Sequence, residues 1–309
     1  MERKSLKKRL RKSISLNLLD TEVAKEGEAS SQGGRQAGGG SYASDTYTHM
    51  AVAIDGVDSE DFIGIMDNAY TKFVNEIKAQ GYEIISPDVA GTSKYYEGWD
   101  RKKGGAINSG QMNGYLMATP NNFEYYVKKT SKKGKEKSTF VDNSMKLSKE
   151  LDDAIIAKVT FAFPTIKMKT SGGAYSFNGS SVKATIDFRI APLASDGSAF
   201  GQPAYTKVTF IQGKGPGISA QAIAVTSIKS DISIEGFFAD TKFKERTAKK
   251  VTQASSNPGY YNVVFTDSQS TAVTHTAAAD HDAYVSKSNQ IIDELLDASL
   301  ADLKEKAGN

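Results

Sequence analysis

The residues of this chain that could bind a metal lie close together near its C-terminal end. His275 and His281 are two of only three histidines, and Asp280 and Asp282 flank the second of them. Imidazole nitrogens and carboxylate oxygens are common ligands of divalent ions. Their spacing matches no standard ligand pattern, however, and Asp280 is equally suited to cap the helix that should follow. We favour the helix cap and predict no metal or other cofactor.

The chain contains no recognisable catalytic motif. Residues 213–217 (GKGPG) come nearest to a phosphate-binding loop, but they lack the G-x-x-x-x-G-K-[ST] spacing. Pro216 also has no amide hydrogen to donate to a phosphate. The G-x-S-x-G, H-E-x-x-H and G-x-G-x-x-G motifs do not occur, and there is no cysteine to act as a nucleophile or thiolate ligand. We therefore predict that the protein is not an enzyme.

Positive charge is concentrated in two segments, although the formal net charge of the whole chain is only +3. Such a small excess argues against a dedicated nucleic-acid-binding protein, and the chain has no specific nucleic-acid-binding motif. Residues 3–12 form one basic cluster, which could contact an anionic surface. A lysine-rich loop forms the other, and it is either simply solvated or an electrostatic docking site. Its candidate contact residues are Lys128, Lys129, Lys132, Lys133, Lys135 and Lys137.

The N-terminal part of the sequence differs in composition from the rest. Leu6, Leu10, Ile14 and Leu18 recur at every fourth position among basic residues, which is typical of an amphipathic helix over residues 1–25. Residues 27–44 are rich in glycine and serine, as flexible linkers are. We expect a basic arm and linker over residues 1–46 and a single elaborated α/β domain over 47–309. No signal peptide of the standard kind and no transmembrane helix are expected.

The first strand of this domain should lead into an amphipathic helix. Residues 50–57 (MAVAIDGV) predict a strand, and apolar residues then recur at helical spacing from Phe62 to Ile77. Residues 82–86 predict the next strand, so the three elements suggest a βαβ unit with parallel strands. Further helices are expected near residues 95–103, 142–153 and 240–251, and further strands near 114–119, 123–128, 205–212, 218–238 and 260–266.

The most regular pattern lies within residues 147–193. Apolar and polar residues alternate from Val182 to Ile190, as in a strand with one buried face. A partner strand over residues 155–169 changes the parity of its apolar residues at Pro164, where we expect a bulge or bend. The glycine-rich segment between them predicts a long central hairpin. The fold class is therefore α/β (α+β), with a mixed β-sheet and packed helices.

The C-terminal segment has the strongest helical pattern in the chain. Its apolar residues form a stripe from Tyr284 to Leu303, and such a stripe must pack on a sheet or on another chain. We predict a homo-oligomer that forms through this helix and the tip of the central hairpin. The candidate self-association residues are Tyr175, Phe177, Ile292, Leu296 and Leu300.

One segment resembles a known family. Residues 151–156 (LDDAII), at the passage from a helix to a strand, are similar to a segment of the TolB N-terminal-like and curli secretion pore subunit family, and the order of elements over 47–305 is similar too. The resemblance implies a periplasmic fold and a non-enzymatic cell-envelope protein that forms rings or acts in assembly. Two departures are the missing lipoprotein cysteine and a hairpin, residues 175–182, that is short and polar for membrane strands.

Two functions follow as predictions, and an enzyme of unknown type is kept as a third hypothesis. The first is a structural or assembly protein that self-associates into a ring, tube or filament, in the cell envelope if the resemblance holds and otherwise in the cytoplasm. The alternative is a module that binds a polyanion or a small ligand through the basic arm and the lysine-rich loop.

Overall fold

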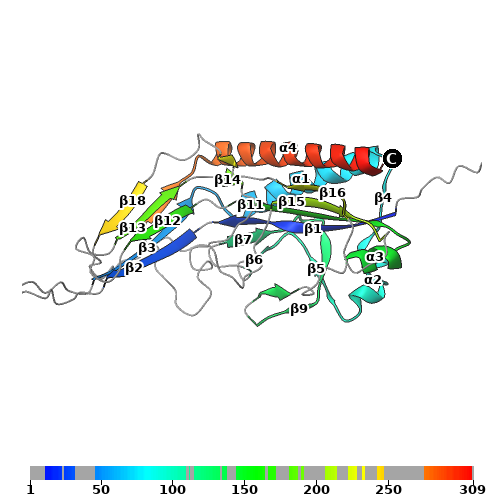
Figure 1. Ribbon diagram of the computed structural model, residues 1–309, viewed down its shortest axis with the longest axis horizontal. Helices are drawn as coiled ribbons and strands as arrows, with labels where there is room; N and C mark the ends of the chain where they lie inside the picture. Colours follow the sequence, from blue (N-terminus) through cyan, green and yellow to red (C-terminus); the bar gives the residue numbers. More distant parts are fainter. Residues whose placement is uncertain are drawn as a thin grey trace, which may run out of the picture.

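A mixed sheet built around an N-terminal strand forms the centre of the protein (Figure 1). The computed structural model describes residues 11–22, 24–31, 46–108, 111, 115–132, 134–137, 144–163, 166–171, 181–186, 189–190, 206–213, 222–227, 232–233, 242–246 and 275–307. β1 (Arg11–Glu22) pairs in parallel with β11 (Ile155–Phe163) on one side, and on the other with β4 (Glu83–Ile84) in parallel and β7 (Tyr115–Ala118) antiparallel. The sheet is completed by β15 (Lys207–Ile211) and β16 (Ala222–Ser227) beyond β11, and by β6 (Ile107–Asn108) beyond β7.

For residues 11–22, strand β1 replaces the amphipathic helix that was predicted over residues 1–25. A four-residue spacing of apolar residues is also a multiple of the two-residue period of a strand. Ile14, Leu16 and Leu18 alternate with polar residues in just this way, and β11 and β7 supply the backbone partners. The sheet therefore begins at Arg11, well before the expected domain start at residue 47.

The expected linker over residues 27–44 is wrong at its start for a related reason. β2 (Ala24–Ser31) pairs antiparallel with β3 (Thr46–Asp55), from Ala24 opposite Ala53 to Ser31 opposite Thr46. Small residues do not prevent strand formation when a neighbouring strand satisfies their backbone groups. Residues 3–10 of the predicted basic arm lie outside the described residues.

Two long helices cover one face of the main sheet. α1 (Ser59–Ala79) begins with a capping box, in which Asp58 accepts hydrogen bonds from the amides of Glu60 and Asp61, and Asp61 accepts one from the amide of Asp58. α4 (His281–Ala307) runs alongside it (Figure 1). Both helices were expected from their apolar periodicity, and both are confirmed.

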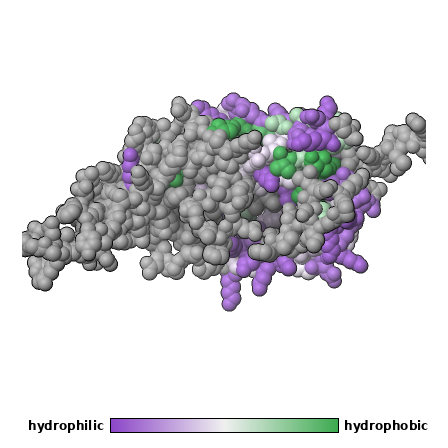
Figure 2. Space-filling view, in the orientation of Figure 1, coloured by the Kyte–Doolittle hydropathy of each residue, from purple (hydrophilic) through white to green (hydrophobic). Residues whose placement is uncertain are grey.

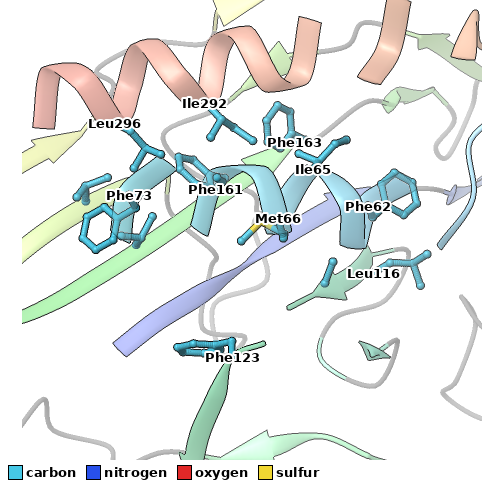
Figure 3. Close-up of a cluster of buried hydrophobic side chains, with 14 of the residues drawn as sticks. Phe62, Ile65, Met66, Phe73, Leu116, Phe123, Phe161, Phe163, Ile292 and Leu296 are labelled. Carbon is cyan, nitrogen blue, oxygen red and sulfur yellow. The ribbon is translucent and has the colours of Figure 1, made fainter. Parts of the chain in front are cut away.

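The hydrophobic core lies between these helices and the sheet, as Figure 3 shows. Phe73 of α1 stacks on Phe210 of β15, with ring centroids 6.2 Å apart. Phe62 meets Tyr284 of α4 edge to face at 6.2 Å. The core also contains the buried side chains of Ile65, Met66, Leu116, Phe161, Phe163, Ile292, Leu296 and Leu300.

The predicted βαβ unit is not formed. β3 lies between β2 and β19 (His275–Ala278) in a separate three-stranded sheet, whereas β4 pairs with β1 in the main sheet. α1 therefore connects two sheets. β4 is also only two residues long, because Ser86 caps α2 (Pro87–Gly91) directly afterwards.

The central hairpin is confirmed for residues 166–171 and 181–186. β12 (Ile166–Ser171) pairs antiparallel with β13 (Ser181–Ile186), and β18 (Lys242–Arg246) adds a third strand. β11 ends at Phe163 in the main sheet and β12 begins at Ile166 in this smaller one, and Pro164, where a bulge or bend was expected, lies outside the described residues. β18 replaces the basic helix predicted over 240–251, since pairing with β13 overrides the local preference. β12 also contacts β2, so the two three-stranded sheets lie together at one end of the molecule (Figure 1).

Short elements cover the opposite side of the main sheet. They include α3 (Ser144–Glu150) and the 3-10 turn η1 (Lys94–Tyr96), which stands with β5 (Asp100–Lys103) in place of the helix predicted over residues 95–103. β5 pairs with β8 (Glu124–Val127), and β9 (Lys129–Thr130) with β10 (Glu136–Lys137). A separate pair, β14 (Arg189–Ile190) with β17 (Ile232–Ser233), contacts β11. The strand predicted over 260–266 lies outside the described residues. No helix in the described ranges is long and apolar enough to cross a membrane.

Candidate functional site

The predicted self-association residues of α4 do not form a surface. Ile292, Leu296 and Leu300 are 1%, 0% and 3% exposed, and they pack in the core against the molecule's own sheet and α1. The apolar stripe that contains them was expected to pack either on a sheet or on another chain, and it packs on the sheet. The prediction that these three side chains contact a second copy is therefore corrected. Tyr175 and Phe177 lie outside the described residues.

The lysine-rich segment forms an ordered hairpin. Lys129 pairs with Lys137 across β9 and β10, and the Lys128 amide donates a hydrogen bond to the Lys137 carbonyl at 3.1 Å. Gly134 takes the positive φ of +84° that its turn requires. We call residues 128–137 the basic hairpin. Its exposed lysines in the described part are Lys128, Lys129, Lys132, Lys135 and Lys137, and Lys133 lies outside it.

The one acid of the basic hairpin points inward. Tyr125 Oη of β8 donates a hydrogen bond to Glu136 Oε1 at 3.1 Å, and burial raises the pKa of both groups. Asn108 Nδ2 donates to the Gly134 carbonyl at 3.1 Å and holds the turn. The carboxylate therefore faces the body of the protein, while the lysines face solvent.

This arrangement makes the outer surface of the basic hairpin positive. Figure 2 shows hydrophilic side chains projecting from the lower edge of the molecule, where Figure 1 places β9. Among the described residues, no ion pair involves any of its five exposed lysines. Their charges are thus available to an external anion.

The neighbouring strand β5 adds less positive charge than its sequence suggests. Arg101 contacts Glu124, and its Nη1 atom lies 2.6 Å from Asp88 Oδ1. The hydrogen bonds to Glu124 and Asp88 hold the guanidinium in a local network and raise the pKa of Arg101. Lys102 pairs with Tyr125 across the two strands, and its positive charge interacts with the carboxylate of Glu136. Lys103 remains exposed.

Four aromatic rings lie beside β5 and β8. Tyr96 stacks on Tyr126, with centroids 4.4 Å apart, and Trp99 lies 5.3 Å from both Tyr95 and Tyr96. Tyr126 Oη donates to the Pro87 carbonyl at 2.9 Å. The cluster joins η1 and α2 to β8. No local sequence pattern predicts the whole cluster, because Tyr126 is distant in sequence and only the Tyr-Tyr-x-x-Trp pattern of residues 95–99 marks the other three rings.

Two adjoining hollows meet at Tyr70 and Ile84, with volumes of about 550 and 350 Å³. Lys78 and Lys103 line them, but so do Glu83 and Glu124. The charges are balanced, so these hollows have no preference for an anionic ligand.

His275 and His281 belong to different elements. No group of three or more His, Asp or Glu side chains in the described ranges is arranged to hold a metal ion. His275 belongs to β19, whereas His281 pairs with Asp61 and Asp282. The Asp280 carboxylate accepts a hydrogen bond from the Ala283 amide at 3.0 Å, which confirms it as a helix cap. Of residues 213–217, only Gly213 is described, and its amide donates to Ser148 Oγ at 2.8 Å.

Known proteins provide no assignment for this arrangement. Comparisons of the chain with protein-family models, curated proteins and solved structures give no match. The similarity to the TolB-like and curli pore family consequently stays an expectation based on residues 151–156 and the order of elements.

Proposed function

We propose that the protein binds a polyanion through the basic hairpin. The observation that supports this proposal is the separation of charge within it: five exposed lysines face solvent, and Glu136 is turned toward Tyr125. The contact residues are Lys128, Lys129, Lys132, Lys135 and Lys137.

The binding energy would come mainly from the release of counterions. A chain of closely spaced negative groups holds condensed cations, and lysines that replace them release those cations into solution. The hairpin backbone is already ordered by the Lys128–Lys137 and Ser131–Lys135 hydrogen bonds, so binding need not order it. The small net charge of the chain does not oppose such contact, because screening limits charge effects to about 10 Å at 0.1 M salt.

The test is a titration of the full chain with heparin and with a mixed-sequence oligonucleotide over a series of salt concentrations. We expect affinity to fall linearly with salt on logarithmic axes. A triple variant, K129E/K132E/K137E, should bind much more weakly and show a smaller salt slope. The matched control is K149E/K207E/K304E, which makes the same charge change at exposed lysines elsewhere. Equal weakening by both variants would mean that only net charge matters and would refute the proposal.

The backbone arrangement favours self-assembly as a second function. Among the described strands, β18 and β12 each pair only with β13, and this sheet contacts the sheet of β2 and β3 at one end of the molecule. Outer strands can accept a strand of another copy through their free backbone groups. Self-assembly would then use strand edges and not the buried face of α4. The resemblance noted above would place such an assembly in the cell envelope.

Light scattering on the full chain across a wide concentration range tests this second function. A mass that stays at that of one chain at all concentrations would refute it. A larger, defined mass that survives high salt would support it and separate it from charge-driven clustering.

A further inference from the structure

We infer that the polyanion is a single-stranded nucleic acid and that one of its bases stacks on Trp99. This inference rests on the proposed function, since it supplies the chemical class of the ligand for the same surface. The evidence for it is the position of Trp99 relative to the basic hairpin and the packing of Tyr95 and Tyr96 against the Trp99 ring.

The strand register places Trp99 and the basic hairpin at the same end of one two-stranded sheet. β5 and β8 are antiparallel, and their last pair is Asp100 opposite Val127. Trp99 immediately precedes Asp100, and Lys128 immediately follows Val127. Both therefore leave the sheet at the same end, one residue beyond its last register pair. A ligand held by the lysines can reach the indole.

The Trp99 ring is supported but not enclosed. Tyr95 and Tyr96 contact it at centroid distances of 5.3 Å, with interplanar angles of 38° and 73°. Tyr96 is fixed in turn by stacking on Tyr126. The indole is nevertheless only half-buried, so part of its surface is open. A ring held in this way is preorganised for a planar ligand.

The charges around Trp99 favour a base over a phosphate at this position. Glu97 and Asp100 are exposed on either side of it and would repel a phosphate, whereas the lysines of the basic hairpin attract one. A single-stranded nucleic acid suits both regions. Its charged backbone can contact the lysines, and its unpaired bases present neutral faces that stack on aromatic side chains such as Trp99. A duplex keeps its bases stacked inside and offers the lysines only phosphates.

Tryptophan fluorescence tests this directly, since Trp99 is the only tryptophan of the chain. The unaltered full-length protein is titrated with oligothymidylate, with inorganic polyphosphate, and with a duplex of equal length. We expect oligothymidylate to quench the indole emission, and polyphosphate and duplex to bind without quenching it. Heparin serves as a fourth probe, and a change of emission as large as that caused by oligothymidylate would assign the site to a polysaccharide and overturn the inference.

Variants give a second measurement by anisotropy of labelled ligands. Trp99→Leu should weaken oligothymidylate binding by about 5- to 100-fold and leave polyphosphate binding unchanged. Trp99→Phe keeps an aromatic face and should lose less. Binding of oligothymidylate without quenching, or an equal loss for both ligands, would overturn the inference and leave the proposed function standing. If no polyanion binds the unaltered protein, the proposed function itself fails, and the fluorescence test does not depend on the folding of any variant.

Discussion

His281 and Asp61 connect the beginnings of the two long helices. The imidazole Nε2 atom of His281 lies 2.8 Å from Asp61 Oδ1, and its Nδ1 atom lies 2.9 Å from Asp282 Oδ1. The other carboxylate oxygen of Asp61 accepts the Asp58 amide in the capping box of α1. One carboxylate therefore both caps α1 and binds α4.

This pair predicts a loss of stability in alkaline solution. The hydrogen bonds with Asp282 and Asp61 raise the pKa of His281 from 6.5 to about 9. Because the folded state binds the proton more tightly, the stabilisation is complete below pH 6.5 and is lost as the pH rises through about 9. The free energy of unfolding, measured by urea denaturation across this range, should fall with pH, and it should do so less steeply in His281→Gln.

Salt and a control variant separate this effect from others. The His281 side chain is 53% exposed, so added salt should reduce the pH dependence. Asp302→Asn breaks the pair between the partly buried Asp302 and the exposed Lys306 at the other end of α4 and should leave the profile unchanged. An identical profile for His281→Gln and the unaltered protein would contradict the prediction.

The capping box of α1 makes a second prediction. Asp58→Ala removes the acceptor for the amides of Glu60 and Asp61 and should lower the free energy of unfolding by about 1 kcal/mol. Asp58→Asn keeps an acceptor oxygen and should cost less. Denaturant unfolding of the three proteins at pH 7 measures both, and equal stability of the alanine variant and the unaltered protein would show that the cap has no effect.

The burial of Leu296 predicts that it acts on stability and not on assembly. Leu296→Ala removes a fully buried side chain between α4 and the sheet, and it should lower the free energy of unfolding by about 2–5 kcal/mol. Leu295→Ala makes the same change at the partly exposed neighbouring position and should cost less. Light scattering should give the same mass for all three proteins at temperatures where they are folded. A mass that drops in Leu296→Ala with no loss of stability would restore the predicted role in self-association.

The sequence alone predicts those elements whose residue pattern fits only one type of secondary structure. In α1, apolar residues at helical spacing coincide with Asp58 at the start and Gly81 at the end, so periodicity and capping agree. The stripe of α4 was equally clear. Its partner was not, because an apolar stripe has the same pattern whether it packs on a sheet of its own chain or on another chain.

The remaining elements depend on contacts that no local pattern contains. Four-residue spacing in residues 11–22 fits a helix and a strand alike, and only pairing with β11, far along the chain, decides between them. The lysines of the candidate site were visible in the sequence, but its geometry was not. The Tyr125–Glu136 and Asn108–Gly134 hydrogen bonds and the Tyr96–Tyr126 stack join residues that are 11 to 30 positions apart.

The hydrogen bond between Tyr125 and Glu136 leads to the last prediction. Burial raises the pKa of Glu136, and the hydrogen bond from Tyr125 opposes that rise. Tyr125→Phe removes this donor, so the pKa of Glu136 should rise further, as a carboxyl titration by NMR would show. The basic hairpin should also open more readily, because a partly buried carboxylate loses a partner. Faster hydrogen exchange of the Lys128 and Ser131 amides, which bond to the Lys137 and Lys135 carbonyls, would report this opening.

Tyr96→Phe is the matched control for this experiment, since it removes a phenol from the neighbouring aromatic cluster and leaves Glu136 untouched. It should change neither the pKa of Glu136 nor the exchange of the two amides. Polyanion affinity should fall in Tyr125→Phe but not in Tyr96→Phe, because only an ordered hairpin presents its lysines without a cost in conformational entropy. Unchanged exchange in Tyr125→Phe would show that the backbone hydrogen bonds and Asn108 hold the hairpin without the phenol.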